Sequence, residues 1–120
     1  MKYRESEEMY LETILLLKRQ KGNVRSLDIA DELKYSRASV SRGMTLLRQK
    51  GFITFNESQM INFTEIGEKK AVEIYERHSI LTKMLIKIGA SNEIATENAC
   101  RLEHVITPEL LDIIKDFLKK

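Results

Sequence analysis

Residues 26–63 read SLDIADELKYSRASVSRGMTLLRQKGFITFNESQMINF. Apolar residues recur at helical spacing on both sides of a tight turn centred on Tyr35, and Ser26 and Ser36 are each placed to cap the start of a helix. Two short runs rich in β-branched and aromatic residues follow, separated by a polar turn over 56–59. The stretch therefore predicts two helices followed by a β-hairpin.

Helical periodicity also governs the chain on both sides of this stretch. Glycines and N-cap residues mark where the helices end and begin. The expected elements are a first helix ending near Gly22, a second starting at Ser26, a third from Ser36 to Gly51, strands over 52–55 and 60–63, a long helix from Thr64 to about Ile88, a helix from Ser91 and a last one from Thr107 and Pro108.

Three helices followed by a hairpin are the pattern of a winged helix-turn-helix, whose third helix enters the major groove of DNA. We therefore expect a mainly α fold. It has an N-terminal winged helix-turn-helix DNA-binding domain over 1–64 and a helical C-terminal domain over 65–120.

The start of the third helix has the residue types that DNA contact requires. Small side chains allow close approach, hydroxyls donate to phosphates or bases, and an arginine binds a guanine edge through two hydrogen bonds. The wing over 56–59 is expected along the DNA backbone or in the minor groove, where Glu57 is unfavourable. Winged helices also serve as protein-interaction modules, which is the alternative. The predicted DNA-contacting residues are Arg25, Ser36, Arg37, Ala38, Ser39, Ser41 and Arg42.

The charge distribution favours DNA contact more than the net charge does. Twenty Lys and Arg against eighteen Asp and Glu leave a formal net charge of +2, too small to indicate nucleic-acid binding by itself. Residues 33–56, however, hold five basic residues and no acidic one, whereas residues 91–120 hold six acidic and four basic ones. The basic middle of the chain is expected to face phosphates.

Composition excludes several classes of protein. The 120 residues are 42% hydrophobic and 32% charged, which is typical of a folded globular domain and not of a disordered chain. No apolar run is long enough for a transmembrane helix or a signal peptide, so we expect a cytoplasmic protein with no membrane partner. The single cysteine, Cys100, excludes an internal disulfide framework.

A cluster of metal-ligand residue types occurs near the C-terminus. Cys100, Glu103 and His104 have the spacing i, i+3 and i+4, which places a thiol, a carboxylate and an imidazole on one face of a helix. All three are metal-ligand types. The trio therefore predicts one part of a metal site.

Other residues of the same types lie on two other predicted helices. Met9 and Glu12 form an i, i+3 pair on the first helix, and His78 interrupts the apolar stripe of the long helix. Each alone has an ordinary structural explanation, because methionine packs as a hydrophobe and a core histidine is usually hydrogen-bonded. Periodicity does not show whether the three helices meet.

The chain resembles the diphtheria toxin repressor family of iron- and manganese-dependent transcriptional regulators, from Glu7 to about Leu118. The resemblance is carried by EMYLETI at 8–14, DIADEL at 28–33 with SVS at 39–41, TEIG at 64–67, RH at 77–78 and ACRLEHV at 99–105, the most specific of them. It implies a winged helix joined to a helical dimerisation domain, forming a homodimer whose binding to a palindromic operator is activated by a divalent metal.

The resemblance also implies six metal ligands: Met9, Glu12, His78, Cys100, Glu103 and His104. The methionine and the Cys-x-x-Glu-His motif match the activating site of the iron-responsive branch. The other two match a two-metal site of the manganese-responsive branch, which has Asp and Glu in place of the methionine and the cysteine. Thr96 and Thr82 occupy positions where the iron branch has the His and the Glu of an ancillary site, so a second site of that type is not expected. The SH3-like third domain of the longer iron regulators is not expected either.

Thioether and thiolate are soft donors, so we expect Fe(II) as the metal, with Mn(II) as the alternative, while Zn(II), Co(II) and Ni(II) are expected to bind in vitro. The expected function is a repressor of metal-uptake genes. A winged-helix regulator that senses a small effector or oxidation of Cys100 is the first rival. A metalloenzyme is the second, and we do not expect it because no spacing sets a general base beside a substrate pocket.

Overall fold

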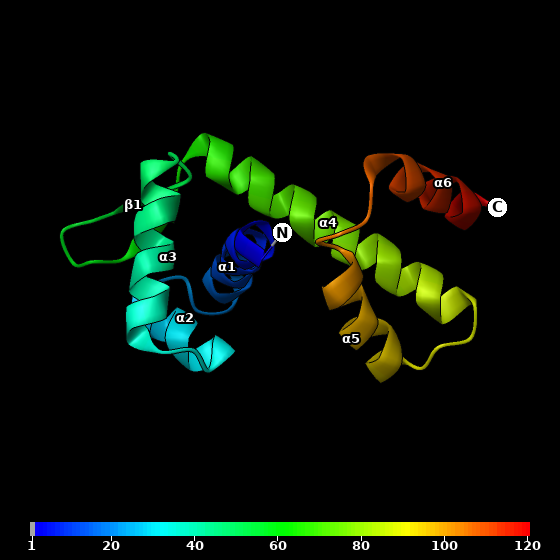
Figure 1. Cartoon of the computed structure of the whole chain (residues 1–120), viewed down its shortest axis with the longest axis horizontal. Coiled ribbons are helices and arrows are strands. Elements are labelled where there is room, and N and C mark those ends of the chain that lie inside the picture. The colour runs from blue at the N-terminus through cyan, green and yellow to red at the C-terminus, as the bar shows by residue number, and fades with distance from the viewer. Residues whose placement is uncertain (1) are drawn as a thin grey trace. The chain divides into compact units, whose positions relative to one another are not determined.

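The computed structural model describes residues 2–120, with side chains described from Glu7 onward. The described elements are, in order, α1 (Lys2–Lys21), α2 (Ser26–Leu33), α3 (Arg37–Gln49), β1 (Ile53–Phe55), β2 (Ile61–Phe63), α4 (Glu65–Lys87), α5 (Asn92–Leu102) and α6 (Pro108–Lys119) (Figure 1). The mainly α fold is confirmed. The chain divides into two compact units, Met1–Val72 and Glu73–Lys120, and α4 begins in the first and ends in the second.

Hydroxyl side chains start four of the helices, as the sequence predicts. Ser36 Oγ accepts a hydrogen bond from the backbone N–H of Ser39 at 3.1 Å, at the start of α3. Thr64, Ser91 and Thr107 accept the equivalent bond at the starts of α4, α5 and α6. These bonds satisfy backbone donors that the first turn of a helix leaves unpaired.

The predicted N-cap at Ser26 is wrong by one residue. Arg25 occupies the N-cap position, and its backbone N–H donates to Asp28 Oδ2 at 2.8 Å. Asp28 also accepts a hydrogen bond from Lys21 Nζ at 2.8 Å. This bond from Lys21, followed by the one from Arg25, holds the pKa of the Asp28 carboxyl below its usual range. The Asp28 carboxylate in the first turn of α2 thus makes a capping hydrogen bond in place of the one predicted for the Ser26 hydroxyl.

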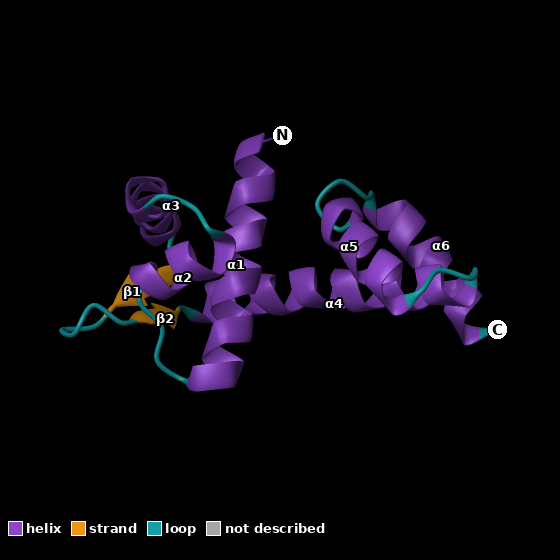
Figure 2. Ribbon diagram, turned by 90° about the horizontal axis from the view of Figure 1, so that it is seen from below, coloured by secondary structure: helices purple, strands orange, loops and turns teal. Residues whose placement is uncertain are grey.

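The hairpin is shorter than predicted. Its antiparallel register pairs Ile53 with Phe63 and Phe55 with Ile61, so each strand loses its expected first residue. The Phe52 N–H donates to the carbonyl of the last turn of α3, and the Met60 N–H donates to an asparagine side chain in the turn. Figure 2 shows the two strands beside the helices, with their turn projecting away from them.

One apolar core holds the first unit together. It takes buried side chains from α1, α2, α3, both strands and the start of α4, and Gly67 lets α4 approach the hairpin. A Cβ on Gly67 would lie 1.8 Å from the carbonyl oxygen of Phe52, so only glycine fits there. The fully buried members of this core include Leu11, Ile14, Val24, Ile29, Val40, Met44, Leu47, Ile53, Ile61 and Ala71.

The second unit packs α5 and α6 against the C-terminal half of α4 (Figure 1). Leu81, Ala99 and Ile114, one from each helix, are its buried centre. Ile88 and Leu102, which the periodicity places inward, are 65% and 39% exposed, because the helices end at Lys87 and at Leu102 itself. Among the described residues, no helix has the length and hydrophobicity that crossing a bilayer requires.

Candidate metal centre and nucleic-acid interface

The predicted DNA-contacting residues of α3 lie on one exposed end of that helix. Ser36, Arg37, Ala38, Ser41 and Arg42 are exposed, and Ser39 is half-buried. The Ser36 hydroxyl donates to Ser39 Oγ at 2.9 Å, and Arg42 Nη2 donates to the same oxygen at 3.4 Å. The structure therefore brings six of the seven predicted residues together.

Arg25, the seventh, lies apart from them at the start of α2. Its Nε donates to the backbone carbonyl of Ser58 at 3.1 Å. Ser58 belongs to the turn that joins the two strands, where Asn56 Oδ1 accepts hydrogen bonds from two backbone N–H groups. The Arg25 guanidinium is thus hydrogen-bonded to the wing. Its remaining N–H donors can face a phosphate.

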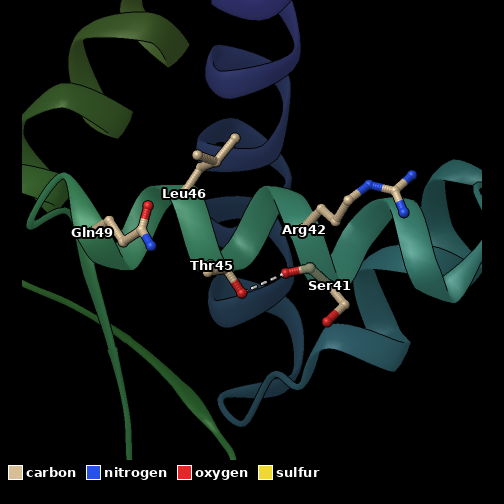
Figure 3. A pocket seen from close by; sticks show the side chains of 5 residues that line it. All are labelled: Ser41, Arg42, Thr45, Leu46 and Gln49. Carbon is tan, nitrogen blue, oxygen red and sulfur yellow. Dashed lines mark hydrogen bonds between the residues drawn. The ribbon is translucent and has the colours of Figure 1, made fainter.

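The outward face of α3 continues beyond the predicted residues into a shallow hollow. Ser41, Arg42, Thr45, Leu46 and Gln49 line it, as Figure 3 shows. Thr45 Oγ1 donates to the Ser41 carbonyl at 3.0 Å. Leu46 is 52% exposed.

The sequence analysis missed three of these residues: Thr45, Leu46 and Gln49. Their signal was present, because positions 41, 45 and 49 follow one another at i+4 on the face opposite Val40 and Met44. An exposed leucine and a threonine methyl can contact a thymine methyl, and a glutamine can bind an adenine edge.

Two basic residues of the acid-free segment are engaged within the first unit. Lys50 Nζ lies 3.0 Å from Glu7 Oε2, and the Arg48 guanidinium lies 5.7 Å from the centre of the Phe55 ring. The predicted contribution of this segment to phosphate binding is therefore concentrated at the start of α3.

The candidate metal centre lies in the second unit, where α4 passes the end of α5. His78 projects from α4, and Cys100 projects from α5. His78 Nδ1 lies 3.8 Å from Cys100 Sγ and 3.6 Å from Glu103 Oε1. One ligand atom from each of these three residues lies within 4.8 Å of the other two. A thiol, an imidazole and a carboxylate from separate elements therefore converge.

Glu103 and His104 follow α5, whereas the sequence placed them on its face. The helix ends at Leu102, but Glu103 keeps helical backbone angles and donates its N–H to the Ala99 carbonyl at 2.9 Å. Glu103 therefore still lies at the predicted i, i+3 position relative to Cys100, although it is one residue beyond the end of α5. His104 is buried, and its Nε2 lies 3.5 Å from Glu103 Oε1.

The Glu103 carboxylate is the unusual group of this cluster. It is fully buried, and among the described residues neither oxygen has a hydrogen-bond partner. Burying a carboxylate without compensation is unfavourable, so such a group is normally paired or bound to a cation. Two ligands that each lie about 2.0–2.3 Å from a metal are at most roughly 4.6 Å apart, and the separations of 3.8 Å from His78 to Cys100 and 3.6 Å from His78 to Glu103 satisfy this. The residues present therefore fit a divalent transition metal.

Tyr75 is a further residue near this centre that the sequence analysis did not identify. Its ring stacks on the His78 imidazole, with centroids 6.2 Å apart and planes at 27°. One turn separates the two residues on α4, so an i, i+3 aromatic pair was the available signal. The contact restricts the orientation of the imidazole.

Met9 and Glu12, the remaining predicted ligands, lie on α1 in the first unit. Met9 Sδ accepts a hydrogen bond from the Tyr35 hydroxyl at 3.3 Å. Glu12 is only 9% exposed. Burial of the neighbouring Tyr10 raises the pKa of its phenol, which keeps that side chain neutral.

Comparison with protein families finds two matches that follow one another along the chain. Residues 2–60 match the N-terminal DNA binding domain of iron dependent repressors. Residues 64–120 match the metal binding and dimerisation domain of iron dependent repressors.

Individual proteins match over nearly the whole chain. Transcriptional regulator MntR of Escherichia coli O6:H1 is 35% identical over 98% of this chain and 76% of its own length. An uncharacterised HTH-type transcriptional regulator of Methanocaldococcus jannaschii is 29% identical over 97% of this chain and 94% of its own. A solved manganese-dependent transcriptional repressor in complex with manganese superposes with a TM-score of 0.87 over 94% of this chain and 52% of its own, at 21% identity.

Proposed function

Because this chain belongs to the iron-dependent repressor family, the diphtheria toxin repressor family of metal-dependent regulators, we propose that Fe(II) is the metal that activates it. The chain is a metal-sensing, DNA-binding transcriptional repressor that acts as a homodimer on operator DNA. The observation that carries the choice of metal is the donor set, in which the Cys100 thiol lies with His78 and Glu103. The family consists of transcriptional regulators, and we propose no enzymatic role for the site.

Sulfur donors support iron over manganese. Thiolate and thioether groups are soft ligands, whereas Mn(II) prefers oxygen ligands. Cys100 supplies a thiol and Met9 is proposed to supply a thioether. The solved repressor that this chain resembles is manganese-dependent, which supports Mn(II) as the alternative. Zn(II), Co(II) and Ni(II) are expected to bind in vitro by the general order of affinities.

We propose that His78, Cys100, Glu103 and His104 hold the metal together with Met9 and Glu12. When bound, the metal supplies positive charge that compensates the buried Glu103 carboxylate. Metal binding requires a deprotonated thiol and neutral imidazoles, so metal affinity is expected to fall as the pH is lowered. The predicted residues of α3, extended by Thr45, Leu46 and Gln49, are proposed to read the operator, with Arg25 on the wing.

The test of the metal is a titration of DNA binding against free Fe(II), under reducing and oxygen-free conditions, and against free Mn(II). The DNA is a duplex selected from a randomised pool by metal-loaded protein. We expect Fe(II) to raise DNA affinity, and Met9→Asp to shift the preference toward Mn(II), because a carboxylate replaces a soft ligand. Activation of the wild-type protein by Mn(II) but not by Fe(II) contradicts the proposal.

Two variants separate metal sensing from the thiol-sensing alternative. Glu103→Gln removes a ligand and leaves the thiol, whereas Cys100→Ser removes the thiol and leaves an oxygen donor. Metal sensing predicts that Glu103→Gln loses the metal response. A thiol sensor instead keeps its response to oxidants in Glu103→Gln and loses it in Cys100→Ser.

A further inference from the structure

A hydrogen bond within the first unit joins α1 to the turn that precedes α3. The Tyr35 hydroxyl donates to Met9 Sδ at 3.3 Å, across 26 residues of sequence. The Tyr35 ring also packs edge-on against Tyr10, the residue after Met9, with centroids 6.3 Å apart and planes at 86°. Two consecutive residues of α1 are therefore in contact with one side chain of the turn.

Tyr35 is hydrogen-bonded to the end of α2 and immediately precedes the N-cap of α3. Its backbone N–H donates to the Ala30 carbonyl at 3.1 Å, and the next residue, Ser36, is the N-cap of α3. A displacement of the Tyr35 side chain therefore acts on the end of α3 that carries the predicted DNA-contacting residues.

The helices α1 and α3 are in close contact about two turns further along α3. A Cβ built on Gly43 of α3 would lie 2.3 Å from the ring of Tyr10, and Tyr10 is 7% exposed. Close packing of this kind transmits small displacements between helices. The Tyr10 ring thus lies against α3, and the Tyr35 side chain in the turn before α3 contacts both Met9 and Tyr10.

We propose that Tyr35 is a positioning residue that links Met9 to the recognition helix, so that metal binding and DNA binding are coupled through the Tyr35–Met9 hydrogen bond. The inference rests on the proposed function, since it takes Met9 as a metal ligand. A thioether sulfur is a weak acceptor with two lone pairs, so it can accept a hydrogen bond from the phenol O–H with one lone pair and offer the other to a metal. The coupling is reciprocal: bound DNA must raise metal affinity by the same factor as bound metal raises DNA affinity.

The first test is the ratio of DNA affinities with and without Fe(II), for the wild-type protein and for Tyr35→Phe, on the selected duplex. Phenylalanine keeps the ring that packs on Tyr10 and removes only the donor. Loss of one hydrogen bond to a weak acceptor predicts a ratio lower by roughly two- to threefold, the lower end of the range for a hydrogen bond. If the wild-type protein responds to Fe(II) and Tyr35→Phe has the same affinity ratio, the inference is overturned and the proposed function is left intact. A wild-type protein without any metal response overturns both.

A double-mutant cycle shows whether Tyr35 acts through Met9. The affinity ratio is measured for the wild type, for Tyr35→Phe, for Met9→Leu and for the double variant. We expect Tyr35→Phe to have no further effect on the ratio once Met9 is leucine, because the hydrogen bond no longer exists. Additive effects of the two substitutions overturn the link between these residues.

The second readout does not depend on DNA. In protein labelled with ¹³C at its five methionine methyl groups, the Met9 resonance is identified by its loss in Met9→Leu. We expect Tyr35→Phe to shift that resonance in the metal-free protein, and addition of diamagnetic Zn(II) to shift it further in the wild type. A Met9 resonance that is the same in Tyr35→Phe and the wild type contradicts the contact. Thermal unfolding of the metal-free variants controls for a purely structural effect, which would lower stability without changing the affinity ratio.

Discussion

The α3 reading surface and the metal cluster differ in how their polar groups are satisfied. At the reading surface, the Ser36 hydroxyl and the Arg42 guanidinium both donate to Ser39 Oγ. In the metal cluster, the Glu103 carboxylate is fully buried, and neither oxygen is hydrogen-bonded within the described part of the chain. The polar groups of the first region pair with one another, whereas the carboxylate of the second region needs a cation to be fully paired.

This difference indicates which region can act as a switch. A surface with satisfied hydrogen bonds has one stable arrangement with or without a ligand. In the described part of the chain, the Glu103 carboxylate has the His78 and His104 imidazole nitrogens at 3.6 and 3.5 Å but no hydrogen bond. Its buried charge gives a cation a differential affinity for the assembled site, which is the requirement for coupling. Four predictions, and one control variant that accompanies the first of them, test this contrast, beginning with the largest expected effect.

Glu103→Gln is expected to abolish the metal response. The amide keeps the size of the side chain but cannot donate charge to a metal. For a metal that raises DNA affinity a hundredfold, this is a loss of about 2.7 kcal/mol of coupling. The measurement is DNA binding with and without Fe(II), and a full response in the variant contradicts the assignment of Glu103 as a ligand.

Glu103→Met is the matched control for the cost of burial. Replacing an uncompensated buried charge by an apolar side chain of similar volume is expected to stabilise the metal-free protein by about 1 kcal/mol or more. Urea unfolding in the presence of a chelator measures this. A destabilised metal-free variant would show that the carboxylate is already compensated without metal.

Gly67→Ala tests the packing of the first unit, which carries the reading surface. The new Cβ meets the backbone carbonyl of Phe52, and backbone cannot rotate away, so we expect destabilisation of about 2 kcal/mol, within the range for overpacking. Chemical denaturation of the metal-free protein provides the measurement. Gly22→Ala is the comparison, because its new Cβ meets no atom within 4 Å but its φ of +82° is unfavourable for alanine by about 1 kcal/mol. A loss in Gly67→Ala no larger than the loss in Gly22→Ala argues against the close approach.

Arg42→Ala is expected to weaken recognition of the selected duplex by about 1 to 2 kcal/mol relative to a scrambled duplex, in the lower part of the range for one base contact. Arg101→Ala removes the same charge from α5, where the side chain is 76% exposed and lies 3.4 Å from Glu97. It should change the discrimination little, because surface pairs contribute little. Equal discrimination by the two variants counts against Arg42 as a reading residue.

Asp28→Asn is expected to have the smallest effect, a loss of about 0.5 to 1 kcal/mol at neutral pH, typical of a weakened helix cap. The pKa of Asp28 is lowered in the folded protein by its bonds to Lys21 and Arg25. The carboxylate therefore stabilises the fold above its unfolded pKa of about 3.9, and this contribution disappears as the pH falls through the lowered folded value. Urea unfolding at pH 7 and at pH 3 should show the difference between variant and wild type shrinking in acid, and a pH-independent difference refutes this.

The sequence predicted the local features of both regions. Hydroxyl residues marked four helix starts, and the spacing of Cys100 and Glu103 placed a thiol near a carboxylate. It misplaced the cap of α2 because Asp28 competes successfully with Ser26 for the capping role. Local competition of this kind depends on side-chain geometry, which residue spacing does not contain.

Features that join distant segments could not be predicted from periodicity. The Tyr35–Met9 hydrogen bond links two elements 26 residues apart, and no pattern within either helix indicates it. The complete burial of Glu103 depends on α5 ending at Leu102 and on how the following turn packs. Helix ends are the least certain part of any pattern-based prediction.

The most direct measurement of the central claim is X-ray absorption at the iron edge of Fe(II)-loaded protein prepared without oxygen. Ligation by the cluster of His78, Cys100 and Glu103 predicts a sulfur shell at about 2.3 Å, the usual metal–thiolate distance, together with nitrogen and oxygen ligands. Its amplitude should fall in Cys100→Ser. A wild-type spectrum with nitrogen and oxygen ligands alone, identical to that of Cys100→Ser, would contradict the account.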